Sequence, residues 1–139
     1  MKTNDHGQML LPELEQAIQK TLDEGKIPFF VNATAGTTLL GAFDDFHGIA
    51  NICEKYQIWM HVDGCLGSSA ILSKKYSHLL DGTERAQSLS WNPHKTLGVP
   101  LQCMKSIYQS NLNIIIIFCR LTDYFQREIV TFKSKLVKC

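Results

Sequence analysis

Three polar residues follow one short predicted strand of this sequence and could together do chemistry. The segment Ser88–Trp91 runs into Asn92, Pro93, His94 and Lys95. A lysine on a solvated helix face is usually a surface charge. A lysine placed after a strand can instead be partly desolvated near other cations, so that its pKa is lowered and its free amine forms an imine with an aldehyde. Lys95 is therefore the first candidate for a covalent catalytic group.

A carboxylate and a threonine follow two earlier apolar segments. Asp63 has two interpretations, a cap of the following turn or a carboxylate that pairs with the ring nitrogen of a cofactor. Facing a cation, such a carboxylate stays ionised even where it is partly buried. Thr34 either belongs to a simple chain reversal at Gly36 or offers its hydroxyl to a ligand. Asn92 and His94 can donate to phosphate or ring oxygens, although each alone is more often an ordinary paired polar residue.

These residues need elements that bring them together. The hydrophobic spacing predicts helices over 11–25, from Asp44 or Asp45 to about Tyr56 and over 73–80, and strands over 27–32, 58–62 and 88–91. Strands that alternate with helices indicate a parallel α/β sheet, in which ligands gather beyond the carboxyl ends of the strands. We therefore expect Thr34, Asp63 and residues 92–95 to share one edge of the sheet.

Bulk composition argues against several classes of protein. The net charge of +1 gives no basis for binding nucleic acid or a membrane surface. No apolar run approaches the roughly 20 residues of a transmembrane helix, and residues 1–11 do not resemble a secretory signal. Five scattered cysteines without CxxC, and no HExxH pattern, argue against a disulfide framework and a metal site. We expect a cytoplasmic protein without a metal.

The character of the chain changes near Cys103. Residues 1–103 contain eight Lys/Arg and eleven Asp/Glu, a net charge of −3, whereas residues 104–139 contain six and two, a net of +4. The later part includes the run Ile114–Ile117, which is β-prone and uncharged. We expect 1–103 to form a domain and 104–139 to be an atypical tail that adds no strand or helix to the sheet. The alternative is that the isoleucine run docks as an edge strand.

Six short segments follow one another along the chain: PFFVNATAGTT (28–38), GAFD (41–44), ICEKY (52–56), WMHVD (59–63), WNPHK (91–95) and LQC (101–103). With these ordered motifs, residues 7–103 resemble the group II pyridoxal 5'-phosphate (PLP) dependent amino-acid decarboxylases, especially the glutamate and cysteine sulfinate decarboxylase branch. The resemblance implies an α/β chain, part of the large domain of the fold-type-I PLP-dependent transferase fold, with a mostly parallel sheet and flanking helices. It also implies decarboxylation of glutamate, cysteine sulfinate or aspartate, by a homodimer in the intact enzyme.

The resemblance gives each candidate residue a role. Lys95 would be the Schiff-base lysine, and Asp63 would pair with the pyridine nitrogen of PLP. Thr34 and Asn92 would be further cofactor contacts, and His94 would support the phosphate or the lysine.

The chain also departs from the family pattern. The family usually follows the aspartate with two alanines, an aromatic residue and glycines, whereas this chain has Gly64, Cys65, Leu66, Gly67 and Ser68. Cys65 falls where a small alanine packs against the cofactor ring, which predicts a poorer fit. Family members are several hundred residues long, so we expect the upstream phosphate-binding segment and the C-terminal domain to be absent. The alternatives are a truncated non-catalytic product, an aromatic amino-acid decarboxylase of the same family, or another fold-type-I enzyme such as a lyase.

Overall fold

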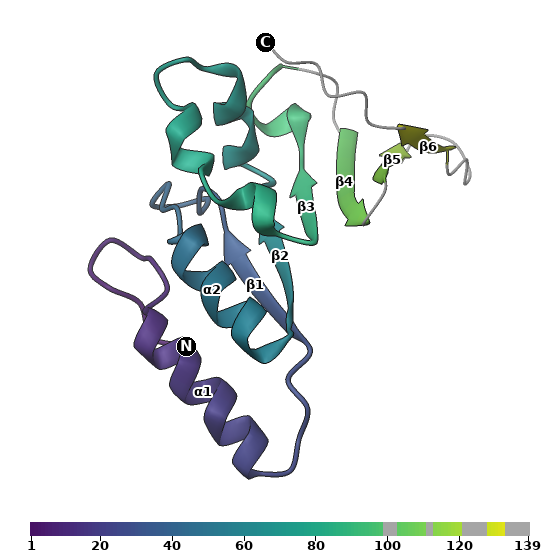
Figure 1. The fold of residues 1–139 in the computed structure, drawn as a ribbon. Coiled ribbons are helices and arrows are strands. Elements are labelled where there is room, and N and C mark those ends of the chain that lie inside the picture. Colours follow the sequence, from purple (N-terminus) through teal and green to yellow (C-terminus); the bar gives the residue numbers. More distant parts are fainter. Residues whose placement is uncertain (99–102, 111–112, 121–127, 133–139) are drawn as a thin grey trace.

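The described residues of the computed structural model, 1–98, 103–110, 113–120 and 128–132, form one sheet with helices on it (Figure 1). The helices are α1 (Leu11–Asp23) and α2 (Phe46–Tyr56). The strands, in both chain and sheet order, are β1 (Phe30–Thr34), β2 (Trp59–Asp63), β3 (Ser88–Trp91), β4 (Cys103–Ser110), β5 (Asn113–Arg120) and β6 (Glu128–Phe132). Short 3-10 turns cover Gly67–Leu72, Ser77–Leu80, Thr83–Arg85 and Pro93–Lys95.

The first three strands are parallel, as the alternation of strands and helices predicts. Thr34 of β1 pairs with Asp63 of β2, which pairs in turn with Ser90 of β3. α2 packs against β1 and β2, and α1 packs against α2 (Figure 1). This arrangement confirms the predicted α/β class and places the ends of all three parallel strands at one edge.

Both helices form for reasons that are visible in their sequences. α1 has Pro12 in its first turn, where no backbone N–H is needed, and it buries Leu14 and Ile18 one turn apart. α2 begins after Asp45, whose side chain accepts a hydrogen bond from the Gly48 N–H at 3.0 Å. Such a cap satisfies one of the free N–H groups at the helix start.

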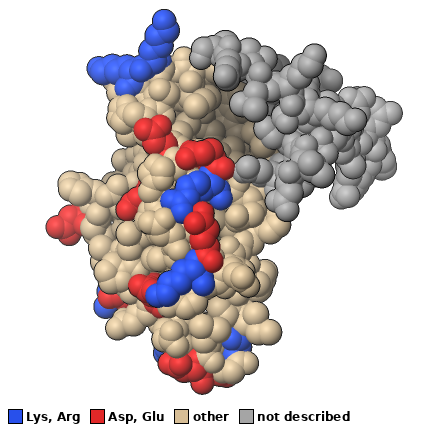
Figure 2. Space-filling model, viewed as in Figure 1, with Lys and Arg blue, Asp and Glu red and all other residues tan. Residues whose placement is uncertain are grey.

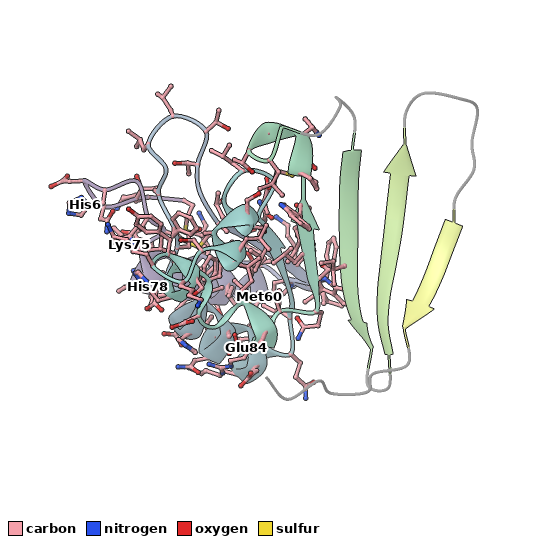
Figure 3. All side chains as sticks on the ribbon, turned by 90° about the horizontal axis from the view of Figure 1, so that it is seen from above. His6, Met60, Lys75, His78 and Glu84 are labelled. Carbon is pink, nitrogen blue, oxygen red and sulfur yellow. The ribbon has the colours of Figure 1, made fainter. Side chains whose placement is uncertain are left out.

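The core lies between α2 and one face of the parallel strands. Its largest fully buried side chains are Ile49 of α2 and Met60 and Val62 of β2 (Met60 is labelled in Figure 3). Each contributes roughly 1.5–3 kcal/mol by leaving water. Exposed residues alternate with buried ones along β1 and β2, so the other face carries a stack of Phe30 on His61, with ring centroids 5.8 Å apart.

Ion pairs bridge the surface above the core. Figure 2 shows Lys and Arg beside Asp and Glu on the face that carries the helices. Lys55 of α2 reaches Glu15 of α1 at 2.6 Å, and Arg85 reaches Glu54 of α2 at 2.8 Å. Such exposed pairs are typically worth under about 1 kcal/mol each, so they add little stability, and only the first of them joins α1 to α2.

The strand that we expected over 27–32 is displaced toward the carboxyl end. It covers Phe30–Thr34, and Pro28 lies before it. Proline lacks the N–H that pairing requires and is disfavoured inside a sheet. The displacement brings Thr34 into the strand instead of the following turn.

The helix that we expected over 73–80 is absent, and this prediction was wrong. The 3-10 turns Gly67–Leu72 and Ser77–Leu80 cover much of this part of the chain. Leu80 is buried, but Lys74 and Lys75 are exposed, so the segment has no continuous apolar face. An isolated helix of this length is marginal without such a face.

The prediction that residues after Cys103 add no strand was also wrong. β4 pairs antiparallel with β3, β5 with β4, and β6 with β5 (Figure 3). Two physical reasons favour this outcome: β3 would otherwise be an open edge, and Ile114–Ile117 has the β-branched side chains that strands favour. The division into a domain over 1–103 and a tail over 104–139 stays a prediction.

Candidate functional site

Three polar residues lie side by side where the parallel strands end. Thr34, Asp63 and Ser90 are register partners on β1, β2 and β3. The N–H of Ala35 then donates to the Asp63 carbonyl oxygen at 2.8 Å, which extends the pairing past the end of β1. Because the strands are parallel, the segments that follow them all leave from this edge, as the sequence predicts.

Thr34 is held in place by Asp44. One carboxylate oxygen of Asp44 accepts from the Thr34 N–H at 2.7 Å, and the other accepts from the Met9 N–H at 2.7 Å. The Asp44 N–H donates to the Thr34 carbonyl oxygen at 3.0 Å. Sequence reasoning treated Asp44 only as a possible helix cap. The structure gives that role to Asp45 and uses Asp44 to join the N-terminal segment to β1.

Close backbone contact fixes the loop after β2. The Gly67 N–H donates to the Ala35 carbonyl oxygen at 3.0 Å. Gly36 has a φ of +80°, and a Cβ built on it would lie 2.9 Å from the Cα of Gly67. A Cβ on Gly67 would overlap the Ala35 carbonyl oxygen. Only glycines allow the two loops to approach this closely, and their contact holds the loop beside Asp63.

In this loop the Ser68 side chain fills the space that a methyl group on residue 64 would occupy. Gly64 stands where the family usually has alanine, and a Cβ built on Gly64 would overlap the hydroxyl oxygen of Ser68. Ser68 is 5% exposed, and no described residue hydrogen-bonds to its hydroxyl. The Ser68 N–H donates to the Gly64 carbonyl oxygen at 2.9 Å. The departure from the family pattern at residue 64 is therefore matched by a second one at residue 68.

The Asp63 carboxylate is half-buried and ionised. Burial alone would raise its pKa, but hydrogen bonds from the thiol and the amide of Cys65 and from the Ser90 hydroxyl, together with the charge of Lys95, outweigh burial. The net effect lowers the pKa of Asp63 below its usual value. The structure thus brings Asp63 within electrostatic reach of Lys95, as both proposed roles require.

The segment after β3 is a short turn. Lys95 closes the 3-10 turn Pro93–Lys95, and its N–H donates to the Asn92 carbonyl oxygen at 3.0 Å. The Asn92 N–H reaches the Cys65 carbonyl oxygen at 3.3 Å. His94 is half-buried, whereas Lys95 is exposed. The partial desolvation that we expected for Lys95 is therefore absent from the described residues, because the short turn ends there and Thr96 after it is exposed too.

One buried atom of this turn has no hydrogen-bond partner among the described residues. The side-chain oxygen of Asn92 is buried, and no described residue hydrogen-bonds to it. A buried polar atom without a partner costs about 1–3 kcal/mol, so this oxygen calls for a donor that the described residues do not provide. The amide, the Asp63 carboxylate and the Lys95 amine together fit the polar groups that hold PLP.

Sequence reasoning missed the contacts of two serines. Ser90 donates to Asp63 at 3.3 Å, and the indole N–H of Trp91 donates to the hydroxyl of Ser69 at 2.9 Å. Ser69 also contacts the hydroxyl of Thr96. Alternation along β3 puts Ser88 and Ser90 on one face, but it does not say which of them lies beside Asp63, and nothing in the sequence pointed to Ser69.

The described residues contain neither a metal cluster nor a membrane-spanning helix. No three His, Cys, Asp or Glu side chains gather there in a way that could hold a metal ion. In the same part of the chain, no helix has the length and apolar character to cross a membrane. Cys53 and Cys65 are free thiols.

A family model described as the pyridoxal-dependent decarboxylase conserved domain matches residues 1–134. The chain belongs to the pyridoxal-dependent decarboxylase family. This finding confirms the resemblance drawn from the motifs.

Curated relatives agree with the family. An acidic amino acid decarboxylase of Xenopus tropicalis is 49% identical over 115 residues, which are 83% of this chain and 22% of that protein. Glutamate decarboxylase of Drosophila melanogaster is 53% identical over 102 residues, 73% of this chain and 20% of that protein. Human cysteine sulfinic acid decarboxylase is 44% identical over 115 residues, with 83% and 23% covered. This pyridoxal-dependent decarboxylase chain thus spans about a fifth of the length of these relatives.

Solved structures of the family confirm the fold. Mouse CSAD in apo form superimposes with a TM-score of 0.77 at 45% identity, covering 80% of this chain and 24% of that one. Oryza sativa TDC with PLP gives a TM-score of 0.69 at 35% identity, covering 74% and 22%. The chain therefore has part of the large PLP-binding domain of the fold-type-I fold.

Proposed function

We propose that this chain forms the lysine-bearing part of a PLP site in an amino-acid carboxy-lyase. The observation that carries the proposal is the placement of Lys95 and Asp63. They leave neighbouring strands at the same edge of the sheet, and the charge of Lys95 helps to lower the pKa of the Asp63 carboxylate. An amine and an ionised carboxylate within electrostatic reach are the two side chains that PLP chemistry requires.

Each side chain of the site takes one task. Bound PLP supplies an aldehyde for covalent attachment and a protonated ring that accepts the electron pair released when a bond to the substrate Cα breaks. The Lys95 amine would be the group that binds the aldehyde carbon and that the substrate amine displaces. Ionised Asp63 keeps the proton on the ring nitrogen. The Thr34 hydroxyl, the Asn92 amide and the His94 imidazole provide further contacts to the cofactor.

The proposed substrate is an acidic amino acid, namely glutamate, cysteine sulfinate or aspartate. The curated relatives at 44–53% identity are named as decarboxylases of such substrates, which supports this class. Catharanthus roseus tryptophan decarboxylase in complex with L-tryptophan, at 34% identity, represents the alternative of an aromatic substrate. Release of CO2 from carboxyl-labelled glutamate, cysteine sulfinate and tryptophan, each offered to the chain with PLP, separates the two classes.

Trapping the cofactor tests the assignment of Lys95. The full chain is incubated with PLP, reduced with borohydride, digested and analysed by mass spectrometry. We expect the phosphopyridoxyl mass on the peptide that contains Lys95 and its loss in the Lys95→Ala variant. Lys74 and Lys75 are exposed lysines that serve as internal controls. Labelling of either of them at the level of Lys95 would refute the assignment.

A non-catalytic product is the second candidate function. The observation in its favour is the short span of the chain, about a fifth of its relatives. A chain that carries PLP on Lys95 but releases no CO2 from any of the three substrates supports it. Turnover by the chain alone excludes it. The homodimer of the intact enzyme and its cytoplasmic location stay predictions.

A further inference from the structure

The two oxygens of the Asp63 carboxylate have different surroundings. Oδ1 accepts from the Cys65 N–H at 3.1 Å and from the Ser90 hydroxyl at 3.3 Å. Both of these hydrogen bonds reach Oδ1, and Oδ2 receives neither. A carboxylate held by two donors on one oxygen cannot rotate freely, so the direction of its second oxygen is fixed as well.

The chemistry of the two groups decides which of them donates in the hydrogen bond between Ser90 and Asp63. An ionised carboxylate only accepts, so the Ser90 hydroxyl must donate its single proton to Asp63. The Cys65 sulfur lies 3.4 Å from the Ser90 oxygen. Burial raises the pKa of Cys65, which keeps this thiol protonated.

The strand arrangement explains why Ser90 and no other serine of β3 has this position. Asp63 and Ser90 are register partners, so their side chains leave the same face of neighbouring strands. Ser88 lies two residues earlier on the same face, and its hydroxyl contacts the Trp59 indole nitrogen at 2.8 Å and the Nδ1 of His61 at 2.7 Å. Ser88 therefore shares the strand, the face and the residue type of Ser90 but serves a different pair of side chains.

We propose that Ser90 is a positioning residue of the cofactor site, whose hydroxyl, with the Cys65 amide, fixes Oδ1 of Asp63 and leaves Oδ2 to pair with the ring nitrogen of PLP. This inference rests on the proposed function for the cofactor, but the contact between Ser90 and Asp63 exists without it. Ser90 touches the carboxylate and acts through it. The hydrogen-bond donor to Asp63 thus comes from the neighbouring strand β3, so the motif around Asp63 alone does not reveal it.

The first test needs no cofactor. The Asp63 carboxyl carbon is followed by NMR in the ¹³C-labelled full chain while the pH is lowered. Ser90→Ala removes a donor to the ionised form, so the pKa of Asp63 should rise. Ser90→Thr keeps the hydroxyl and should restore the wild-type titration, and Ser88→Ala should leave it unchanged. An equal rise in Ser88→Ala and Ser90→Ala would overturn the inference, because it would show a general loosening of β3.

The second test uses PLP labelled with ¹⁵N at the ring nitrogen. A lost hydrogen bond to a charged group predicts PLP binding weaker by about tenfold in Ser90→Ala, which is about 1.4 kcal/mol. The ¹⁵N resonance should also move toward that of an unprotonated ring. Ser90→Thr and Ser90→Val form a second pair of matched shape that differs only in the hydroxyl, in case the alanine variant folds poorly.

The two tests separate failure of the inference from failure of the proposed function. Wild-type chain that binds no PLP would refute the proposed function, while the carboxyl titration still decides whether Ser90 controls Asp63. Wild-type chain that binds PLP, with an Asp63 titration and a ring-nitrogen resonance that Ser90→Ala and Ser90→Val both leave unchanged, would overturn the inference alone.

Discussion

Replacing Gly36 with alanine should destabilise the protein through two separable effects. Its φ of +80° lies in the left-handed region, where an L-residue costs about 1–2 kcal/mol. The new methyl group would also lie 2.9 Å from the Cα and 3.0 Å from the N of Gly67. These are backbone atoms that cannot rotate away, and overpacking of this kind costs about 1–3 kcal/mol. The expected loss in the free energy of unfolding is therefore about 2–5 kcal/mol.

Gly41 provides the matched control for this change. It lies in the same loop with a φ of +62°, but nothing lies within 4 Å of a Cβ built on it. Gly41→Ala should therefore cost only the backbone contribution of about 1–2 kcal/mol. The difference between the two variants measures the contact between Gly36 and Gly67.

Urea unfolding of the full chain is the assay. Coincident fluorescence and circular dichroism transitions first establish two-state behaviour, and the midpoint with its slope then gives the free energy of unfolding. Gly36→Ala should unfold at lower urea than Gly41→Ala by a difference of at least about 1 kcal/mol. Equal losses in the two variants would refute the argument, because they would show that the loops separate without cost.

Three further predictions concern α2 and Asp63. Asp45→Ala removes the cap of α2 and should cost about 1 kcal/mol in urea unfolding, whereas Asp45→Asn should cost less; no difference between them and wild type would contradict the cap. Ile49→Ala leaves a cavity in the core and should lower the free energy of unfolding in urea by about 2–5 kcal/mol; a loss well below this range would show that neighbouring side chains fill the cavity. Because the fold lowers the pKa of Asp63, its ionised form contributes stability above the pKa of an unfolded aspartate, about 3.9, and that contribution is lost as the pH falls through the folded value. Urea unfolding of wild type and Asp63→Asn at pH 7 and at pH 3 measures this contribution. The difference in the free energy of unfolding between the two proteins should be smaller at pH 3, and an equal difference at both pH values would contradict the prediction.

The parts of the fold that depend on local pattern could be predicted from the sequence. Leu14 and Ile18 mark the buried face of α1, and Asp63 marks the end of β2. The shared edge of the strands follows from the parallel arrangement. The antiparallel strands after Cys103 were missed, because a change of charge and motif says nothing about whether an open strand edge finds a partner.

The contacts within the site depended on distant parts of the chain and could not be predicted. Two neighbouring aspartates look alike in the sequence, yet Asp44 reaches Thr34 and Met9 while Asp45 caps α2. Which aspartate bonds to Thr34 and Met9 depends on the path of the N-terminal segment, which brings Met9 to β1. The hydrogen bond from Ser90 to Asp63 depends likewise on the register between β2 and β3, which the sequence does not specify.

The packing of Ser68 against Gly64 constrains how this loop can evolve. Its hydroxyl oxygen occupies the place that the methyl group of an alanine at residue 64 would take. Gly64→Ala should therefore be more harmful while Ser68 is present than after Ser68→Gly, when the backbone carbonyl oxygen of Ser90, at 2.9 Å, still crowds the new methyl group. A lineage that moves from this loop to the alanine-containing one therefore meets less steric resistance when residue 68 becomes glycine before residue 64 becomes alanine.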